Sequence, residues 1–459
     1  MIRLFHVCFP GRTLLLAISE GMLSALTLLA AIYLWFGNNV DLALRYDYGA
    51  LRILFASFVC VLCMYYYDLY DSLVVRSFRE VAARMVQVLG TVCIVLAVIY
   101  YSYPAAQIGR GPMLTWVVVS GIALLLWRRG YVSVSTSAQL GERCILLGDG
   151  PLGKSLAEEI TARPEFGFHL AGYVSQESWK EGAADLPRLG GVEELPEIVR
   201  REKISRVIVG MADRRGHLPV QELLGLKTHG IKIHDAPEIF EAVTGQVPVR
   251  WLQASWLLFS DGFRISRWIL FYKRALSCAV SLCGIALTAP LMALVAVLIR
   301  LDSPGPAIFR QKRIGKDGRP FTLFKFRSMR EDADPARPAL PDDERITRVG
   351  RWIRRCRIDE LPQLFNILRG DMCLVGPRPF IPEAEERYAR EIPFYSQRWS
   401  VPPGATGWAQ IKKGYCSTLE DNVEKLGYDL FYIKNISPGL DCLILLHTIK
   451  ILLLGRGAR

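Results

Sequence analysis

The chain has 459 residues, which is more than one compact core usually holds and argues against a single small domain. Hydrophobic residues make up 51% of the sequence and charged residues only 22%, so long disordered segments and a fully solvated surface are disfavoured. Lys plus Arg exceed Asp plus Glu by 12, which predicts anionic partners such as phosphates, nucleic acid or an acidic bilayer surface. The eleven cysteines lie mostly in apolar runs, so no disulfide framework is indicated.

Four hydrophobic segments precede residue 130, each about as long as a bilayer core is thick. They lie near Thr13–Phe36, Ala50–Tyr67, Val81–Tyr103 and Pro112–Trp127. Arginines gather before the first segment, between the second and third, and after the fourth, whereas the other two loops hold only Arg45 and Arg110. By the positive-inside rule, both ends of this predicted four-helix transmembrane bundle (residues 1–132) face the cytoplasm, and so does the chain after it.

A fifth apolar stretch, Ala275–Ile299, is long enough to span a bilayer, but basic residues flank both of its ends. Pro290 lies near its middle, where a proline removes a backbone hydrogen bond and bends a helix. We therefore predict a re-entrant membrane helix that breaks at Pro290 and returns to the cytoplasmic side, with an ordinary span as the alternative. The apolar chain end, Leu440–Leu454, is short for a crossing and is predicted to pack or to lie at the interface.

Residues 140–255, between the bundle and the fifth apolar stretch, alternate predicted strands and helices, which is typical of a Rossmann-like parallel sheet. The first strand, Arg143–Leu147, is followed by Gly148-Asp149-Gly150-Pro151-Leu152-Gly153 and a helix over Lys154–Ile160. Such glycines let a phosphate approach a helix N-terminus. The second predicted strand ends at Val174-Ser175 without the acidic residue expected for a ribose, so a structural or regulatory domain is favoured over a dinucleotide site. The remaining predicted strands are His169–Val174, Arg206–Gly210 and Ile231–His234.

Positive charge is concentrated after the fifth apolar stretch. Residues 300–330 contain nine basic residues against Asp302 and Asp317, a local net charge of +7. Six arginines then follow between Arg345 and Arg357 with no acid between them, at spacings that predict a basic helix along an anionic surface.

Directly after these arginines stand two carboxylates, Asp359 and Glu360. Strong positive charge lowers the pKa of carboxylates and keeps them ionised, which favours a divalent metal or phosphate chemistry. Farther along, Arg378 lies between Pro377 and Pro379, and a guanidinium on such a stiff backbone suits bidentate contact with phosphate oxygens.

From about Leu270 to its end, the sequence resembles the bacterial sugar transferase family, the monotopic phosphoglycosyl transferases that move a sugar 1-phosphate from a UDP-sugar to polyprenyl phosphate. With the bundle and the Rossmann-like domain in front, the whole chain resembles the long, exopolysaccharide-initiating members. The fold class predicted is membrane α plus α/β, with a mainly helical monotopic catalytic domain over residues 268–459. The matching blocks are the proline-broken helix, Ser303-Pro304-Gly305-Pro306, Lys325-Phe326-Arg327-Ser328-Met329, Asp359-Glu360-Leu361-Pro362-Gln363-Leu364, Gly370-Asp371-Met372, Val375–Pro379 and Gly404-Ala405-Thr406-Gly407-Trp408-Ala409-Gln410.

The resemblance implies a role for each matching position. Asp359 is expected to attack the β-phosphate of the UDP-sugar, expelling UMP and forming a phosphosugar-enzyme intermediate. Glu360 is expected to assist Asp359 or its metal, and the expected ion is Mg²⁺, with both carboxylates as ligands. Arg378, flanked by Pro377 and Pro379, is expected to hold phosphate. Lys325 and Arg327 are expected to add positive potential, with lipid headgroups as the other role open to them.

The sequence departs from the family pattern at the helix break, and it leaves the sugar unidentified. The helix break usually falls at a Ser-Pro pair, whereas this chain has Ala289-Pro290 with Thr288 beside it. The sequence has no local signature for the sugar.

The resemblance also implies partners and a location. The expected partners are a UDP-sugar, undecaprenyl phosphate, membrane lipid and downstream glycosyltransferases, with no nucleic acid; membrane enzymes built this way can pair as homodimers. The location expected is the bacterial cytoplasmic (inner) membrane.

The alternative function is a membrane-anchored NAD-dependent sugar-nucleotide dehydratase or epimerase, which the absence of a Tyr-x-x-x-Lys pair disfavours. A catalytically inactive scaffold is a third hypothesis, disfavoured by the intact Asp359-Glu360 and Arg378 blocks.

Overall fold

A computed structural model describes residues 2–4, 7–37, 49–71, 77–135, 141–176, 179, 186–211, 217–252, 254–330, 343–414 and 418–453. Apart from a few N-terminal residues, which include strands β1 (Ile2–Leu4) and β2 (Val7–Phe9), the chain divides into two compact units. The first unit ends at Ile239 and the second begins at Phe240.

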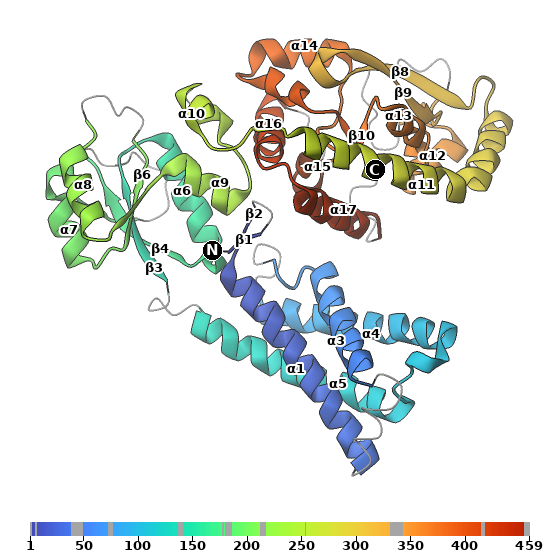
Figure 1. The fold of residues 1–459 in the computed structure, drawn as a ribbon, viewed down its shortest axis with the longest axis horizontal. Coiled ribbons are helices and arrows are strands. Elements are labelled where there is room, and N and C mark those ends of the chain that lie inside the picture. Colours follow the sequence, from blue (N-terminus) through green and yellow to red (C-terminus); the bar gives the residue numbers. More distant parts are fainter. Residues whose placement is uncertain are drawn as a thin grey trace. The chain divides into compact units, whose positions relative to one another are not determined.

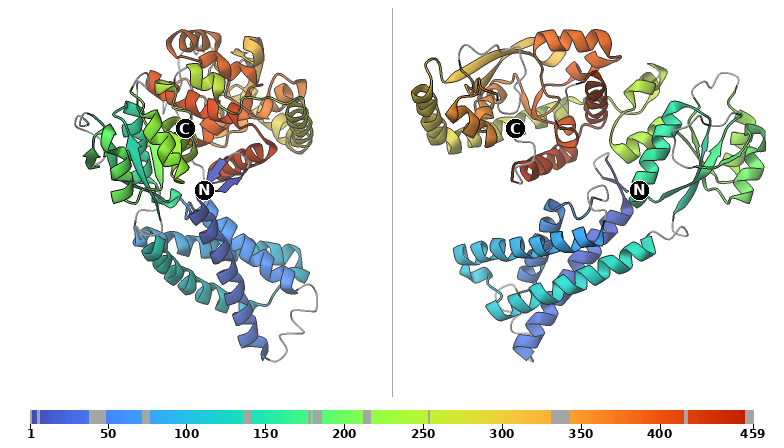
Figure 2. Two further views of the ribbon diagram at one scale, coloured as in Figure 1. Left: turned by 60° about the vertical axis from the view of Figure 1, so that its left-hand side comes forward. Right: turned by 180° about the vertical axis from the view of Figure 1, so that it is seen from behind.

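Four long helices of the first unit pack around one apolar core. They coincide with the four predicted hydrophobic segments, and each is long and apolar enough to cross a membrane. Figures 1 and 2 show them side by side, coloured blue to teal. The helices are α1 (Gly11–Phe36), α3 (Gly49–Tyr66), α4 (Phe78–Ser102) and α5 (Arg110–Ser135), and the largest core side chains are Leu28, Met64, Met85, Leu96, Trp116 and Leu124.

A buried ion pair joins two of these helices. Arg128 on α5 donates from Nε and Nη2 to the two carboxylate oxygens of Glu20 on α1, at 2.5 and 2.9 Å. Its Nη1 donates to the carbonyl of Leu69, just after α3, at 2.7 Å. Each charge in this apolar core therefore has a partner, which is the usual condition for burying charge among membrane helices.

A five-stranded parallel sheet forms the other part of the first unit, in the order β5-β4-β3-β6-β7. This confirms the predicted parallel sheet, to which the structure adds a short edge strand, β5, that the sequence analysis did not predict. Helices α7 and α8 pack on one face, and Figure 1 shows α6 on the other. The elements are β3 (Glu142–Leu147), α6 (Pro151–Ala162), β4 (Phe168–Val174), β5 (Arg188–Gly190), α7 (Leu195–Arg201), β6 (Arg206–Val209), α8 (Val220–Thr228) and β7 (Lys232–Asp235).

The glycine loop between β3 and α6 has the predicted strand-to-helix geometry. Gly148 takes a φ of 108°, and a Cβ there would lie 2.8 Å from the backbone of Met211, so only glycine fits. The indole of Trp179 stacks on Tyr173, with ring centroids 4.2 Å apart, and its Nε1 donates to the carbonyl of Gly148 at 3.3 Å. An aromatic side chain of the domain itself therefore lies against the loop at the end of β3.

The second unit is mainly helical, as predicted. Its strands form a two-stranded antiparallel hairpin, β8–β9, and a short parallel pair, β10–β11. Figure 2 shows the hairpin in gold along one side of the unit. The elements are α9 (Ala236–Thr244, which begins in the first unit), α10 (Ala254–Phe259), α11 (Arg267–Asp302), β8 (Ile308–Ile314), β9 (Pro320–Phe326), α12 (Arg348–Arg355), α13 (Gln363–Arg369), β10 (Cys373–Val375), α14 (Pro382–Glu391), β11 (Gly404–Thr406), α15 (Trp408–Lys412), α16 (Leu419–Lys434) and α17 (Pro438–Leu453).

Residues from Phe240 onward group with this unit, whereas the sequence analysis placed residues up to 255 in the Rossmann-like domain. Contacts with α15 and α16 account for the difference. Trp408 donates from Nε1 to the carbonyl of Gly245 at 2.8 Å, and Lys434 forms an ion pair with Glu241 at 2.6 Å.

Helix α11 contains the predicted fifth apolar stretch and continues through Pro290. Figure 1 shows that it bends along its length, and Pro290 is its one internal proline. The hydroxyl of Thr288 donates to the carbonyl of Gly284 at 2.7 Å. Many of its apolar side chains are exposed, Leu287 by 82%, and the helix is long and apolar enough to enter a membrane.

The first turns of α11 are anchored in the second unit by charge. The ammonium group of Lys273, only 3% exposed, donates to the carbonyl of Val375 at 2.9 Å and forms an ion pair with Asp441 on α17 at 2.8 Å. Arg274 donates to the carbonyls of Ile367 and Leu368 at the end of α13, at 2.5 and 2.7 Å. These residues, which the sequence analysis treated as flanking charge, therefore hold the start of α11 against the rest of the second unit. Helix α17 buries Leu440 and Ile444 and exposes Leu446 and Ile449, as expected for a packed amphipathic end.

Candidate active site

Asp359 and Glu360 lie in a tight turn between α12 and α13. Arg357 takes a left-handed backbone conformation (φ 54°, ψ 22°), and a single 3₁₀ turn, Ile358–Glu360, follows it. A non-glycine residue with positive φ is uncommon and costs free energy, so the packing around this turn must hold it. From this turn, the Glu360 side chain reaches Lys325 on strand β9.

Glu360 is the centre of an ion-pair cluster. Its Oε1 accepts hydrogen bonds from Lys325 Nζ at 3.1 Å and from Arg378 Nη2 at 2.9 Å. Its Oε2 lies 3.7 Å from Nη1 of Arg357. The structure therefore brings together Glu360, Lys325 and Arg378, three of the predicted site residues, from three separate segments of the chain.

The pKa values of the two adjacent carboxyl groups shift in opposite directions. Burial alone would raise the pKa of Glu360, but the charges of Arg378, Lys325 and Arg357 outweigh it and hold that pKa well below its usual range. For Asp359, burial raises the pKa most strongly. The charge of Lys325 lowers this pKa and the charge of Glu360 raises it, but Lys325, Arg354 and Arg378 together do not offset the effect of burial. The expectation that the basic surroundings lower the pKa of both carboxylates is right for Glu360 and wrong for Asp359, because desolvation dominates there.

Asp359 differs from Glu360 in its contacts as well. It is half-buried, and among the described residues its carboxylate makes no hydrogen bond or ion pair. Its lone pairs are therefore available to an incoming group. No group of three or more His, Cys, Asp or Glu residues in the described part of the chain could hold a metal ion by itself. Mg²⁺ is commonly bound by one or two carboxylates plus substrate phosphates, and Asp359 fits that arrangement better than Glu360, whose Oε1 already accepts two hydrogen bonds.

Lys325 is positioned by the buried side chain of Asn366, which the sequence analysis did not single out. Asn366 on α13 accepts from the backbone N–H of Phe324 at 2.9 Å and donates to the carbonyl of Thr322 at 2.7 Å. It also donates to Asp371 at 3.1 Å. These bonds pair the edge of β9 that faces away from β8, so Lys325 is presented from a strand that is fixed on both sides.

The segment that carries Arg378 leaves strand β10 and crosses β11 closely. A Cβ on Gly376 would lie 2.5 Å from the carbonyl oxygen of Pro402, so only glycine allows this approach. Gly376 donates to the carbonyl of Thr406 and the carbonyl of Pro377 accepts from Gly404, both at 2.9 Å. A hollow beside this segment is lined by residues that include Gly315, Pro377, Pro379 and Trp399.

Arg327 has a different place from Lys325. Strand β9 ends at Phe326, and the buried Arg327 guanidinium donates to the carbonyls of Pro304 and Ser303, at 2.6 and 2.8 Å. The structure thus places Arg327 at the end of α11, in the Ser303-Pro304 turn, while Lys325 contacts Glu360.

Comparison with known proteins places these residues in a family. Residues 268–455 match the bacterial sugar transferase family, and residues 66–217 match a CoA-binding domain family. A UDP-glucose:undecaprenyl-phosphate glucose-1-phosphate transferase of Xanthomonas campestris pv. campestris is 32% identical over 74% of this chain and 74% of its own length. The chain belongs to the bacterial sugar transferase family.

Other members of the family match over shorter shares of their own length. An undecaprenyl-phosphate glucose phosphotransferase of Komagataeibacter xylinus is 36% identical over 70% of this chain and 60% of its own length. A UDP-N-acetylgalactosamine-undecaprenyl-phosphate N-acetylgalactosaminephosphotransferase of Aeromonas hydrophila is 44% identical over 50% of this chain and 54% of its own length. The chain thus spans between half and two thirds of these two relatives. Their names agree with the transferase reading and not with a sugar-nucleotide dehydratase or epimerase.

Replacing Asn366 with alanine should destabilise this sugar transferase family member. The change leaves the amide of Phe324 and the carbonyl of Thr322 without their partner, at a cost of about 1–3 kcal/mol for each buried group. We expect a lower midpoint of thermal unfolding for the full chain in detergent than for Gln397→Ala, which removes an exposed amide. Equal midpoints for the two variants would show that Asn366 does not hold β9.

Proposed function

We propose that this chain transfers a sugar 1-phosphate from a UDP-sugar to undecaprenyl phosphate and releases UMP, the first membrane step of exopolysaccharide biosynthesis. One observation carries the proposal: the Asp359 carboxylate has no partner among the described residues, and it stands next to a Glu360 that binds Lys325 and Arg378. Attack on a phosphate needs an oxygen nucleophile with free lone pairs and cations that receive the phosphate charge. The names of the relatives above agree with this chemistry.

The reaction proceeds in two displacements at the same phosphorus atom. A carboxylate oxygen of Asp359 attacks the β-phosphate of the UDP-sugar; the bond from this phosphorus to the bridging oxygen breaks, and UMP leaves with the electron pair. The enzyme then carries a phosphosugar on Asp359. A phosphate oxygen of undecaprenyl phosphate attacks that phosphorus next, expels the Asp359 carboxylate and forms the lipid-linked sugar diphosphate.

The cations around Glu360 serve the phosphate groups. Before substrate binds, Glu360 balances the charges of Lys325 and Arg378 and keeps both side chains at the site. The Arg378 guanidinium uses its remaining donors for phosphate oxygens, in the bidentate geometry that arginine favours. Because the pKa of Glu360 is lowered, Glu360 stays ionised and continues to balance these two cations.

The proposed ion is Mg²⁺, held by Asp359 together with substrate phosphate oxygens. When bound, the ion neutralises charge on the diphosphate and orients it. Glu360 becomes a ligand only through its Oε2 or by releasing Lys325 or Arg378.

The proposed location is the bacterial inner membrane, with the sheet domain and the catalytic unit on the cytoplasmic side, where nucleotide sugars are made. In the described part of the chain, five helices are long and apolar enough to cross a bilayer, which supports a membrane location. The bend in α11 and the basic residues at both of its ends support a re-entrant path. That path keeps Asp359 level with the headgroup of undecaprenyl phosphate.

Asp359→Asn should abolish turnover. The amide cannot form the covalent intermediate, so UMP release should fall at least about a thousandfold, equivalent to about 4 kcal/mol of barrier. The assay offers purified full chain UDP-glucose and UDP-N-acetylgalactosamine with Mg²⁺ and undecaprenyl phosphate, and measures UMP. Asp317→Asn, an exposed acid in the β8–β9 turn, is the control and should keep wild-type turnover. An Asp359→Asn variant that turns over normally excludes Asp359 as the nucleophile.

Removing divalent ions should also stop UMP release. Charge stabilisation by a bound metal contributes several kcal/mol, so EDTA should lower the rate at least about a hundredfold. Excess Mg²⁺ added afterwards should restore it, and Mg²⁺-saturated EDTA serves as the control. Undiminished turnover in EDTA would argue for a metal-independent reaction.

The two ends of α11 should emerge on the same side of the membrane. Trp268 and Leu301 are 79% and 78% exposed at the two ends, so cysteines placed there can be labelled in a background without native cysteines. Neither should react with an impermeant maleimide in intact spheroplasts, and both should react after permeabilisation. Gln107→Cys, in the predicted external loop between α4 and α5, should react in intact spheroplasts. Labelling of only one α11 end from outside would make α11 an ordinary span.

A further inference from the structure

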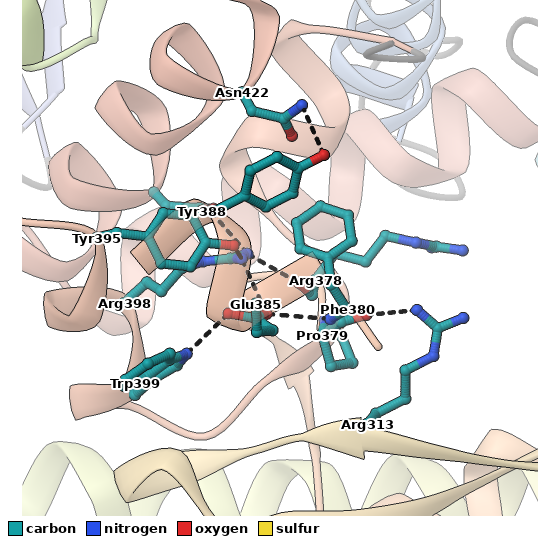
Figure 3. A network of polar contacts seen from close by, with 11 residues as sticks. Arg313, Arg378, Pro379, Phe380, Glu385, Tyr388, Tyr395, Arg398, Trp399 and Asn422 are labelled. Carbon is teal, nitrogen blue, oxygen red and sulfur yellow. Dashed lines mark hydrogen bonds and ion pairs between the residues drawn. The ribbon is translucent and has the colours of Figure 1, made fainter. Parts of the chain in front are cut away.

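A network of buried charges lies under the Arg378 segment and is separate from the Asp359-Glu360 turn. Arg398, Glu385 and Asp429 are exposed by only 4%, 2% and 2%. Nη1 of Arg398 pairs with Glu385 at 3.1 Å, and its Nη2 pairs with Asp429 at 3.1 Å. The guanidinium also lies over the rings of Phe380 and Tyr395, 4.9 and 5.0 Å from their centroids. Figure 3 shows Arg398, Glu385 and Tyr395 gathered beside Arg378, Pro379 and Phe380.

This network forms hydrogen bonds with the backbone on both sides of Pro379. Nη2 of Arg398 donates to the carbonyl of Arg378 at 2.8 Å, and Oε1 of Glu385 accepts from the N–H of Phe380 at 3.2 Å. The carbonyl of Pro379 accepts from Nη1 of Arg313 at 3.3 Å. Three consecutive backbone polar groups are therefore held by charged side chains.

The segment needs this support because of its sequence. Pro377 and Pro379 have no backbone N–H, so the segment cannot form an ordinary strand ladder on either side of Arg378. The guanidinium of Arg378 extends to Glu360 at 2.9 Å, whereas its carbonyl points to Arg398. A shift of that carbonyl would therefore move the phosphate-binding end of the same residue.

We infer that Arg398, held by Glu385 and Asp429, is a positioning residue that fixes the Arg378 backbone so that the Arg378 guanidinium meets the diphosphate. This inference rests on the proposed function, because Arg378 is taken to bind phosphate. Arg398 itself touches no reacting atom; it acts through Arg378. Its planar guanidinium donates hydrogen bonds to Glu385, Tyr395, Asp429 and the Arg378 carbonyl. A lysine ammonium has only three donors and cannot form all four bonds.

The test is a double-mutant cycle on the full chain with wild type, Arg398→Lys, Arg378→Lys and the double variant. A misplacement of about 1 Å at a reacting group can cost about a hundredfold, so Arg398→Lys should lower kcat/KM for the UDP-sugar by about 10- to 100-fold. In the Arg378→Lys background, the same change should cost less than about threefold, since residues that act through one another are not additive. Arg390→Gln, which removes an exposed charge from α14, is the control.

Two further measurements keep the outcome decisive. The thermal midpoint of each variant separates a local effect from unfolding; if Arg398→Lys unfolds, Asp429→Asn replaces it in the cycle, since it keeps Arg398 and Glu385. The dissociation constant of UMP with Mg²⁺ is measured for all four proteins, so a variant without turnover still reports on Arg378. Equal losses in both Arg378 backgrounds, or no loss, would overturn the positioning role. If the UMP dissociation constants of the four proteins show the same non-additivity but the wild-type chain releases UMP from no UDP-sugar, the proposed function alone is overturned.

Discussion

The ion pairs of Glu360 with Lys325 and Arg378 are the interaction on which the candidate site depends. They join the turn after α12, strand β9 and the segment after β10, which are separate in the sequence and are brought together only by the fold. Burying three charged groups is costly unless each finds a partner, so the cluster holds only while all three segments are in place. The same cluster separates the chemistry of two neighbouring carboxyl groups. Glu360 pairs with the two cations and has its pKa lowered, while Asp359 has no partner among the residues that the structure describes and has its pKa raised by burial.

A second constraint connects the catalytic unit to the membrane helix. Lys273 on α11 donates to the carbonyl of Val375, the last residue before the segment that carries Arg378. At the other end of that segment, Arg398 holds the carbonyl of Arg378. The segment that carries Arg378 is thus fixed between a cation of α11 and a cation of the buried network. The position of α11 and that of Arg378 are therefore set by the same stretch of backbone.

Short motifs were sufficient to predict several parts of this arrangement. Asp359-Glu360 and Arg378 stand in local patterns of charge or proline, whereas Lys325 was expected from the resemblance to the family. The parallel sheet followed from alternating strands and helices with a glycine loop. Other parts escaped because no local pattern marks them. Arg398, Glu385 and Asp429 lie far apart in the chain and look like ordinary surface charges until the fold buries them. Arg327 lies two residues from Lys325 in the same motif, yet the end of β9 directs it to the Ser303-Pro304 turn.

The amino-acid sequence alone determined which helices are apolar enough for a membrane, where the basic charge gathers and which carboxylates stand beside it, because these properties depend on composition and spacing over a few residues. Only the tertiary structure decided which of the two carboxylates has no partner among the described residues and whether its pKa rises or falls. It also decided which cations bind the backbone of the segment that carries Arg378. Burial and ion pairing are properties of segments brought together from distant parts of the chain, and desolvation at Asp359 outweighs the local positive charge that the sequence displays.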